Sequence, residues 1–334
     1  MDNPGTRSII KVVVLHDQAL EGAAPDLADN LHQAVGIAEA LTRLGYRIER
    51  LAMDHRLSRT AQALQQLHPD VVFNLVESPR GLGRLVHAAP ALLHRLGLPY
   101  TGSDARAIMF TSNKLLAKKK MHQAGLPIPL WITEAESATA RPTAARYIIK
   151  SVWEHASIGL DESSIWVNGK AGGLDREMAG IRDLLKGDCF AEEYIDGREF
   201  NISLLAGDEG PEVLPPAEIV FDGFGPEQVR IVGYSAKWLP ETFEYNHTNR
   251  RYDFPASDFG LLAELMQLSL TCWSLFQIRG WARVDYRVDA AGRPWILEVN
   301  TNPCLASDAG FVAAASRAGL DMDAVVARIM MDLN

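Results

Sequence analysis

Two strand-like runs near the C-terminus constrain this chain more than any other feature. The runs WARVDYRV and WILEVN, between residues 281 and 300, flank the turn sequence DAAGRP and predict a β-hairpin. Side chains alternate between the faces of a strand, so one register that sets Asp285 opposite Glu298 also sets Arg283 opposite Asn300. That register collects four polar groups on one face. The other face receives an apolar set suited to packing: Val284, Tyr286, Val288, Trp295, Leu297 and Val299.

Two carboxylates that face each other across a hairpin repel unless a positive charge lies between them. Arg283 is one candidate for that charge, and a divalent cation is a better one. The oxygen atoms of Asp285, Glu298 and Asn300, with no His or Cys nearby, suit Mg²⁺ rather than zinc. Mg²⁺ usually takes further ligands from water and phosphates, so the hairpin indicates a nucleotide site. The alternative interpretation is a surface hairpin whose charges face water.

The first third of the chain alternates between strand and helix patterns. A β-branched run at 9–15 precedes helical periodicity in DNLHQAVGIAEALTRLGY, a strand at 48–53, a helix at 60–68 and a strand at 70–77. PALLHRLGLPYTG then predicts a helix, a glycine stop and a short strand. This alternation predicts a parallel α/β domain to about residue 105. No GxGxxG follows the first strand, which argues against a nicotinamide cofactor, and PRGLGRL is interpreted as a plain turn.

The rest of the chain predicts an α+β arrangement with antiparallel strands. A helix is expected to begin at Thr111 or Ser112 and to end at Gly125, before Pro127. ARYIIKSV predicts a strand, GIRDLLKG a helix, and CFAEEYIDGREFNISLLA two strands broken at AspGly. Residues 225–256 lack periodicity and predict a long functional loop. Helices are expected at 258–278 and 309–331.

Charge and cysteine content exclude several classes of function. The net charge of -9, without an arm rich in lysine or arginine, argues against a nucleic-acid partner. The basic run 118–120 is interpreted as a solvated helix face. Cys189, Cys272 and Cys304 are widely spaced, so they predict neither a disulfide framework nor a zinc site. The N-terminus lacks a signal-peptide pattern and no apolar run approaches the length of a membrane span, so a cytoplasmic protein is expected.

Isolated charged residues elsewhere could complete a nucleotide site. Lys150 ends YIIK, Lys114 lies in the first turn of its predicted helix, and Lys237 lies in the long loop. Each ammonium group could reach a phosphate. Glu192 and Glu199 flank a bend in AEEYIDGREF, where backbone amides and a carboxylate could hold a purine and a ribose. Taken alone, each of these residues is more often an ordinary surface residue than a ligand.

Together these segments resemble the ATP-grasp superfamily and, within it, the D-alanine–D-alanine ligases, from Asp70 to the C-terminus. The resemblance rests on LGLPYTGSDARAIMFTSNKLLAKKKMHQAGLPIP, YIIKSVWEHASIG, FAEEYIDGREFNISLL, YSAKWLPET and GWARVDYRV with GRPWILEVNTNPCL, which occur in the family's order. It implies an ATP-grasp fold with a parallel α/β domain at 1–105, a small α+β domain at 106–194, and an α+β domain at 195–334 that carries the metal and acyl-phosphate site. The two α+β domains would sandwich ATP.

The resemblance also implies roles for individual residues. Those expected to bind ATP are Lys114, Lys150, Ser157, Glu192, Glu193, Ile195, Glu199 and Lys237. In the family pattern the lysines hold phosphates, the serine belongs to a loop over them, the first glutamate and the isoleucine contact adenine, and the last glutamate binds the ribose. Asp285, Glu298 and Asn300 would hold two Mg²⁺ ions, for which Mn²⁺ can substitute. The catalytic pair would be Lys237 and Arg283, the latter stabilising the oxyanion formed when an amine attacks an acyl phosphate.

Departures from the family pattern cluster where amino-acid substrates would bind. HDQALE replaces the N-terminal glycine pair and Glu-Arg-Glu-Val-Ser, which leaves Glu21 as a match for the amine-binding glutamate. Ala156 replaces a serine of the phosphate loop, and Trp238 replaces a tyrosine that closes the site. Cys304 replaces a glycine, and Ala309 replaces a serine that holds the second substrate's carboxylate. Cys304 has no evident His partner and is interpreted as a small wall residue rather than a nucleophile.

We therefore expect an ATP-dependent ligase that joins a carboxylate to an amine through an acyl phosphate and releases ADP and phosphate. Its substrates would be amino acids or other small carboxylates, and the changed substrate residues predict that it is not the housekeeping D-alanine–D-alanine ligase. One alternative is that ligase itself. Others are an ATP-grasp enzyme that joins non-amino-acid partners or only phosphorylates a carboxylate, and a nucleotide-binding module without turnover. A homodimer is expected from the family, and no nucleic-acid or membrane partner is expected.

Overall fold

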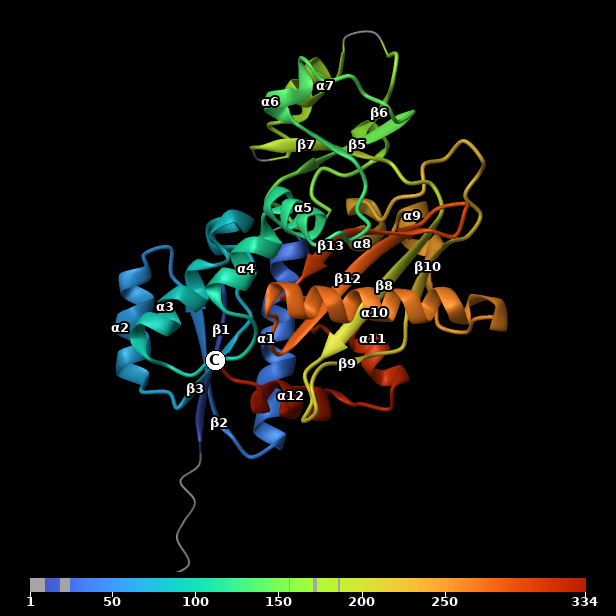
Figure 1. Ribbon diagram of the computed structural model, residues 1–334. Coiled ribbons are helices and arrows are strands. Elements are labelled where there is room, and N and C mark those ends of the chain that lie inside the picture. The colour runs from blue at the N-terminus through green and yellow to red at the C-terminus, as the bar shows by residue number, and fades with distance from the viewer. Residues whose placement is uncertain (1–9, 19–24, 156, 171–172, 186) are drawn as a thin grey trace, which may run out of the picture.

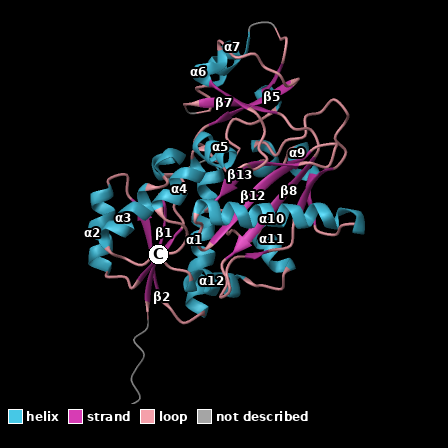
Figure 2. Cartoon of the chain, viewed as in Figure 1, coloured by secondary structure: helices cyan, strands magenta, loops and turns pink. Residues whose placement is uncertain are grey.

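The computed structural model describes residues 10–18, 25–155, 157–170, 173–185 and 187–334. These residues form three β-sheets with helices on their faces (Figure 1 and Figure 2). One sheet is parallel and the other two are antiparallel. In Figure 1 the four-stranded sheet stands above the other two sheets. The predicted sequence of an α/β part followed by α+β parts is confirmed, whereas the domain boundaries at residues 105 and 194 stay predictions.

The N-terminal sheet is parallel, with strand order β2-β1-β3. Its strands are β1 (Lys11–Asp17), β2 (Arg47–Met53) and β3 (Val71–Asn74). The β-branched side chains of β1 are buried because helices cover the sheet, namely α1 (Pro25–Arg43), α2 (Leu57–Leu67) and α3 (Ala88–Leu96). PRGLGRL forms two 3₁₀ turns, η1 (Pro79–Gly81) and η2 (Gly83–Leu85), which agrees with its interpretation as a turn.

The four-stranded sheet has the order β4-β7-β5-β6. Its strands are β4 (Trp131–Thr133), β5 (Arg146–Ser151), β6 (Ile165–Val167) and β7 (Cys189–Glu193). Helices α6 (Glu134–Ser137) and α7 (Gly173–Ile181) pack on it, with the 3₁₀ turn η3 (Glu162–Ser164) before β6. The helix predicted over GIRDLLKG was therefore placed too late in the chain. The observed helix, α7, begins before GIRDLLKG, and its buried face carries Leu174 and Met178.

The helix expected from Thr111 or Ser112 is instead two helices, α4 (Ala105–Ser112) and α5 (Lys114–Gln123). Asn113 caps α5, and its side chain accepts a hydrogen bond from the backbone N–H of Leu116 at 2.9 Å. The Thr111 hydroxyl donates back to the Ala107 carbonyl at 2.9 Å, so it belongs to the end of α4. The predicted N-caps, Thr111 and Ser112, were wrong because the next residue, Asn113, supplies the side-chain acceptor that caps α5.

The large sheet has the order β11-β10-β8-β12-β13, with β9 paired to β8. Its strands are β8 (Arg198–Leu205), β9 (Glu212–Val213), β10 (Ala217–Phe221), β11 (Thr248–Arg251), β12 (Trp281–Val288) and β13 (Pro294–Asn300). The associated helices are α8 (Tyr234–Trp238), α9 (Phe243–His247), η4 (Ala256–Asp258), α10 (Phe259–Phe276), α11 (Gly310–Arg317) and α12 (Met322–Met331). The segment predicted as one loop at 225–256 thus contains α8, α9 and β11.

The two strands expected on either side of AspGly are confirmed as β7 and β8. They lie in different sheets, and the chain passes from one sheet to the other at Gly197, whose φ is +152°. A Cβ there would lie 2.0 Å from the Val288 carbonyl oxygen, so glycine is required. The terminal helix is also two helices. Gly319 has a φ of +79°, and Asp321 caps α12 by accepting from the N–H of Ala324 at 2.8 Å.

The predicted hairpin register is confirmed where its charges lie. Arg283 faces Asn300 and Asp285 faces Glu298. The register then shifts at a β-bulge, so the apolar face was partly wrong: Ile296 is buried, whereas Trp295 and Leu297, which were expected in the core, are only partly buried. A bulge adds one residue to one strand and reverses which side chains face the core.

Helix α10 lies along the large sheet (Figure 1). It is long and apolar enough to cross a membrane by length and composition, contrary to the expectation from the sequence. Its buried residues are Leu265, Ser269, Cys272, Trp273 and Phe276. These residues pack on the sheet, so part of the helix's apolar character belongs to the core of the protein.

Candidate ATP and metal site

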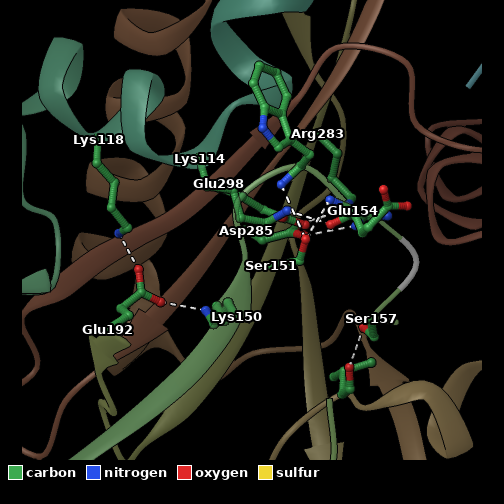
Figure 3. A network of polar contacts seen from close by, with 12 residues as sticks. Lys114, Lys118, Lys150, Ser151, Glu154, Ser157, Glu192, Arg283, Asp285 and Glu298 are labelled. Carbon is green, nitrogen blue, oxygen red and sulfur yellow. Dashed lines mark hydrogen bonds and ion pairs between the residues drawn. The ribbon is translucent and has the colours of Figure 1, made fainter. Parts of the chain in front are cut away.

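A cluster of charged side chains lies where the four-stranded sheet faces the large sheet (Figure 3). In the view of Figure 1, helix α5 and strands β5 and β7 contribute the upper part of the cluster, and the β12–β13 hairpin contributes the lower part. The members of this charged cluster are Lys114, Lys118, Lys150, Glu192, Arg283, Asp285 and Glu298. All but Lys118 were candidates from the sequence, and they come from segments far apart in the chain.

Glu192 holds the upper part together. Its carboxylate forms ion pairs with Lys118 and Lys150 (Figure 3), and the side chains of Glu192 and Lys118 are each only 1% exposed. Burial alone would raise the pKa of Glu192, but the two ammonium groups outweigh it, so the pKa is lowered. Glu192 is therefore ionised, and adenine, if it binds here, meets a carboxylate that two lysines already hold.

Lys118 was wrongly interpreted as part of a solvated face. Helix α5 buries Ala117, Lys118 and Met121, and Lys118 lies four residues after Lys114. Residues four apart lie on the same face of a helix. If Lys114 faces the phosphates, as the sequence predicted, Lys118 must lie on the same face of α5 and cannot belong to a solvated face. That spacing was the available signal. Lys119, the next residue along the helix, points away from this face and is exposed.

We expect Lys118→Met to destabilise the protein by about 3 kcal/mol, because removing one partner of a buried ion pair leaves the other charge poorly compensated. Lys150 still contacts Glu192, which keeps the loss below that of an isolated pair. Urea unfolding without nucleotide measures the change, and Lys119→Met on the exposed face is the matched control. Equal stability of the two variants would show that the Lys118–Glu192 pair adds nothing to the fold.

The hairpin supplies the lower part. Arg283 donates through Nε and Nη2 to the two oxygens of Asp285 at 2.7 and 2.8 Å, and Asn201 donates to Asp285 Oδ1 at 2.8 Å. Burial alone would lower the pKa of the Arg283 guanidinium, but the negative charge of Asp285 has the larger effect, so that pKa is raised. Lys114 lies 3.9 Å from the Glu298 carboxylate. Burial would raise the pKa of Glu298, yet the surrounding cations, Lys114 first, hold that pKa well below its usual range.

The donor set of the hairpin fits Mg²⁺. Asp285 and Glu298 face each other, and Asn300 lies two residues after Glu298 on the same strand. Asp285 accepts three hydrogen bonds, which leaves about one of the four acceptor positions of a carboxylate for a metal. Within the described ranges, no group of three or more His, Cys, Asp or Glu side chains gathers as a metal site. This pattern suits an ion that takes an amide and phosphate oxygens as its other ligands.

Lys237 approaches from the segment 225–256, called here the lid segment, where it lies in α8. Burial lowers the pKa of Lys237, and the nearby Arg283 guanidinium adds to that effect. Glu298 and Asp285 oppose it, so Lys237 is electrostatically coupled to the hairpin. The lysine expected to reach the phosphates from the loop therefore lies at the charged cluster.

The lid segment contacts the loop that follows β5. Ser157 Oγ donates to the Val232 carbonyl at 2.7 Å, and the backbone N–H of Tyr234 donates to the Leu160 carbonyl at 3.1 Å. A Cβ on Gly233 would lie 2.5 Å from the Leu160 oxygen, so the two backbones are closely packed. Ser157 thus joins the two loops, and Ala156 lies outside the described residues.

The remaining nucleotide candidates lie at the junction of the two antiparallel sheets. Glu199 pairs with Arg287 at 2.8 Å, and burial raises the pKa of Glu199 although the guanidinium opposes it. Ile195 is buried, and the backbone N–H of Glu193 donates to the Leu130 carbonyl at 2.8 Å. Their roles toward adenine and ribose stay predictions. Arg287, which the sequence did not single out, fixes the Glu199 carboxylate.

The substrate candidates lie at separate places. The Cys304 thiol donates to Asp29 Oδ2 at 3.0 Å, and burial raises the pKa of Cys304 far above its usual range, so the sulfur is a protonated thiol and not a nucleophile. Ala309 is the N-cap position of α11. Trp238 ends α8, with its ring 6.5 Å from that of Tyr234. Glu21 lies outside the described residues.

Comparison with known proteins decides the family. The family model for the D-ala D-ala ligase C-terminus matches residues 147–331. A D-alanine–D-alanine ligase of Moorella thermoacetica is 30% identical over 329 residues, which cover 96% of this chain and 98% of that relative. The chain belongs to the D-alanine–D-alanine ligase family. An uncharacterised protein of Sinorhizobium fredii, y4sG, is 31% identical to this chain over 274 residues, which cover 78% of this chain and 73% of y4sG.

Solved structures show the same fold. The D-alanine–D-alanine ligase of Bacillus anthracis complexed with ATP has a TM-score of 0.71 at 18% identity, and the match covers 96% of both chains. The D-alanyl-alanine synthetase A of Vibrio cholerae has a TM-score of 0.73 at 13% identity, with 98% of both chains covered. The predicted ATP-grasp fold is confirmed. By its family this protein is an ATP-dependent carboxylate–amine ligase.

Proposed function

We propose that this ligase joins a small amino acid or other carboxylate to an amine through an acyl phosphate, and that its substrates are not the two D-alanines of the housekeeping enzyme. The observation that carries the proposal is a contrast between the residues expected to bind ATP and those expected to bind the substrates. The charged cluster retains the residues expected for ATP chemistry, whereas Cys304, where the family pattern has a glycine, holds Asp29 through its thiol. Trp238 and Ala309 are further changes on the substrate side.

In this proposal Lys114, Lys150 and Lys237 bind the phosphates and balance the negative charge of the transferred group. Mg²⁺, held by Asp285, Glu298 and Asn300, would supply further charge neutralisation there. The substrate carboxylate attacks the γ-phosphorus of ATP, which gives an acyl phosphate and ADP. An amine then attacks the acyl carbon, the C–O bond to phosphate breaks, and the amine loses a proton as the amide forms.

The chain's own groups serve the second step in two ways. Arg283, fixed by its two hydrogen bonds to Asp285, donates to the tetrahedral oxygen that carries the negative charge. The contacts of the lid segment with Ser157 and Leu160 exclude water, which would otherwise hydrolyse the acyl phosphate. Two metal ions per site, exchange of Mg²⁺ for Mn²⁺, a homodimer and a cytoplasmic location stay predictions.

The second candidate function is D-alanine–D-alanine ligation itself, because relatives that match most of this chain carry that name. An enzyme that joins non-amino-acid partners is a third. They differ in which carboxylate triggers ADP release and in whether an amide forms.

We expect D-alanine alone to support ADP release with a kcat/KM about tenfold or more below that of the preferred substrates, since each lost hydrogen bond to a charged group costs about 1–3 kcal/mol. The measurement is coupled ADP release with ATP and Mg²⁺ across pairs of D- and L-amino acids and plain carboxylates, with mass spectrometry of the products. Formation of D-alanyl-D-alanine as the preferred product would show the housekeeping function instead.

A further inference from the structure

A buried arginine on β12 lies where three segments of the chain meet. Arg287 is directly opposite Glu199 in the register of β12 with β8, its neighbour in the large sheet (Figure 1). The guanidinium pairs with the Glu199 carboxylate at 2.8 Å, and the Arg287 side chain is only 5% exposed. Nη1 donates to the Gly197 carbonyl at 3.1 Å, where the chain passes between the two antiparallel sheets. Nη2 donates to the carbonyl of Arg230, which belongs to the lid segment.

The Arg230 carbonyl is held from a second side as well. The Tyr194 hydroxyl donates to it at 3.2 Å, and the Tyr194 ring lies 5.8 Å from the Arg287 guanidinium. A guanidinium at this distance from an aromatic ring gains cation–π attraction, which helps to fix both side chains. Tyr194 follows directly after β7 and precedes Ile195, a residue expected to contact adenine. The start of the lid segment is therefore attached to the part of the chain that would bind the nucleoside.

Glu199 can hold a ligand while it is paired with Arg287. The guanidinium contacts Oε2, and a carboxylate offers about four acceptor positions in all, so two hydroxyl groups can still donate to Glu199. Burial raises the pKa of Glu199, and the charge of Arg287 opposes that shift. Arg287 therefore favours the ionised carboxylate, which is the stronger acceptor, and fixes its direction.

The attachment at Arg230 lies upstream of the lysine that the lid segment carries. After Arg230 comes the contact of the Val232 carbonyl with Ser157, and then α8 with Lys237. Both attachments precede α8, so they determine where the helix places Lys237. A change at Arg287 can therefore affect the phosphates without a direct contact to them.

We propose that Arg287 is a positioning residue that couples recognition of the nucleotide's ribose to docking of the lid segment. Ribose hydroxyls that bind Glu199 fix its carboxylate, the carboxylate fixes the guanidinium, and the guanidinium presents Nη2 to the Arg230 carbonyl. Because coupling between two binding events is reciprocal, docking of the lid segment strengthens ribose binding by the same factor. This inference rests on the ATP site of the proposed function and on the ribose role that the family pattern implies for Glu199.

Nucleotide binding without a carboxylate substrate tests the ribose half of the proposal. Calorimetry compares ATP with 2′,3′-dideoxy-ATP, each with Mg²⁺, for wild type, Arg287→Met, Arg287→Lys and Arg95→Met, an exposed arginine on α3. We expect wild type to bind ATP about tenfold or more tightly than the dideoxy nucleotide, because hydrogen bonds to a charged carboxylate are lost. Arg287→Met reduces this preference to about twofold or less. Arg95→Met keeps the wild-type preference.

Protease protection of residues 225–256 tests the lid half. In wild type, ATP protects this segment, whereas dideoxy-ATP at saturating concentration protects it less. Arg287→Lys keeps a charge beside Glu199, but its compact ammonium lacks the planar fork that reaches all three acceptors. We expect this variant to retain the ribose preference and to lose the extra protection that ATP gives, a separation that simple misfolding would not produce.

Arg287→Met leaves the buried charge of Glu199 without its partner, so folding needs its own check. The double variant Glu199→Gln with Arg287→Met removes both charges and is expected to melt above Arg287→Met, while it still lacks the ribose preference. A wild-type preference for ATP in Arg287→Met, or equal lid protection by ATP and saturating dideoxy-ATP in wild type, would overturn the coupling. If wild type binds ATP with this preference but releases no ADP with any carboxylate, the proposed function fails and the coupling stands.

Discussion

Glu298→Gln is expected to lower kcat by a factor of about 10²–10³ or more, because the substitution removes a charge from the centre of a water-excluded site. Lys114 lies 3.9 Å from the Glu298 carboxylate, and Lys237 and Arg283 both lower its pKa. The same carboxylate is a candidate ligand for Mg²⁺ opposite Asp285. ADP release as a function of Mg²⁺ concentration measures the loss, and we expect a higher Mg²⁺ requirement in any residual activity.

Without metal, the stability of Glu298→Gln shows whether attraction to the nearby cations or repulsion from Asp285 dominates at Glu298. From the sequence, two facing carboxylates repel, so removing one would stabilise the hairpin. The structure reverses that expectation, because cations lower the pKa of Glu298. A lowered pKa means that the carboxylate stabilises the fold above its unfolded pKa and that this contribution is lost as the pH falls. Glu298→Gln should therefore melt below wild type at about pH 7. A higher melting temperature would show that repulsion from Asp285 prevails.

The matched control is Glu264→Gln, an exposed glutamate on α10. It removes one negative charge from the protein without touching the charged cluster, so both kcat and melting temperature should equal those of wild type. A Glu298→Gln enzyme with wild-type turnover would refute the assignment of the hairpin as the metal site.

The hairpin could be predicted because its signals are local. Alternation and a turn sequence fix which residues face each other, and one register explained four polar side chains at once. The bulge beside Asp285 had no such signal, since the alternation of side chains does not mark which residue of β13 stays unpaired with β12. AspGly between β7 and β8 is a related case. A turn sequence marks a change of direction, but it does not say whether the next strand joins the same sheet.

The burial of Lys118 and Glu77 was missed because it arises from contacts between distant segments. Lys118 is enclosed by β7 through Glu192, which is more than 70 residues later in the sequence. Glu77 is enclosed by Gln33 and Asn30 of α1, both more than 40 residues earlier. In a single sequence Lys118 reads as an ordinary lysine in the middle of a helix, and Glu77 reads as an ordinary glutamate just after a strand. The spacing of Lys118 from Lys114 was a usable local signal, whereas for Glu77 the sequence offers none.

Lys237→Met is the second substitution from which we expect a large loss, about a hundredfold in kcat, because a buried charge-assisted contact to the transferred phosphate is removed. Its charge is coupled to Arg283 and Glu298 across the site. Lys119→Met, an exposed lysine on α5, is the control for charge and size. Wild-type kcat in Lys237→Met would show that the lid segment carries no catalytic group.

Gly233→Ala tests whether Lys237 needs the lid segment to be docked. The substitution leaves the lysine side chain unchanged but disturbs the packing of the lid segment against Leu160. The added Cβ would lie 2.5 Å from the Leu160 oxygen, so the two backbones must part. Gly225→Ala in the same segment meets only the flexible end of Gln228 at 3.5 Å and is the matched control. We expect ATP with Mg²⁺ to protect residues 225–256 from protease in wild type and in Gly225→Ala but not in Gly233→Ala, which should lose kcat as Lys237→Met does. Cleavage of wild type that is indifferent to nucleotide would mean that this segment does not close over the site.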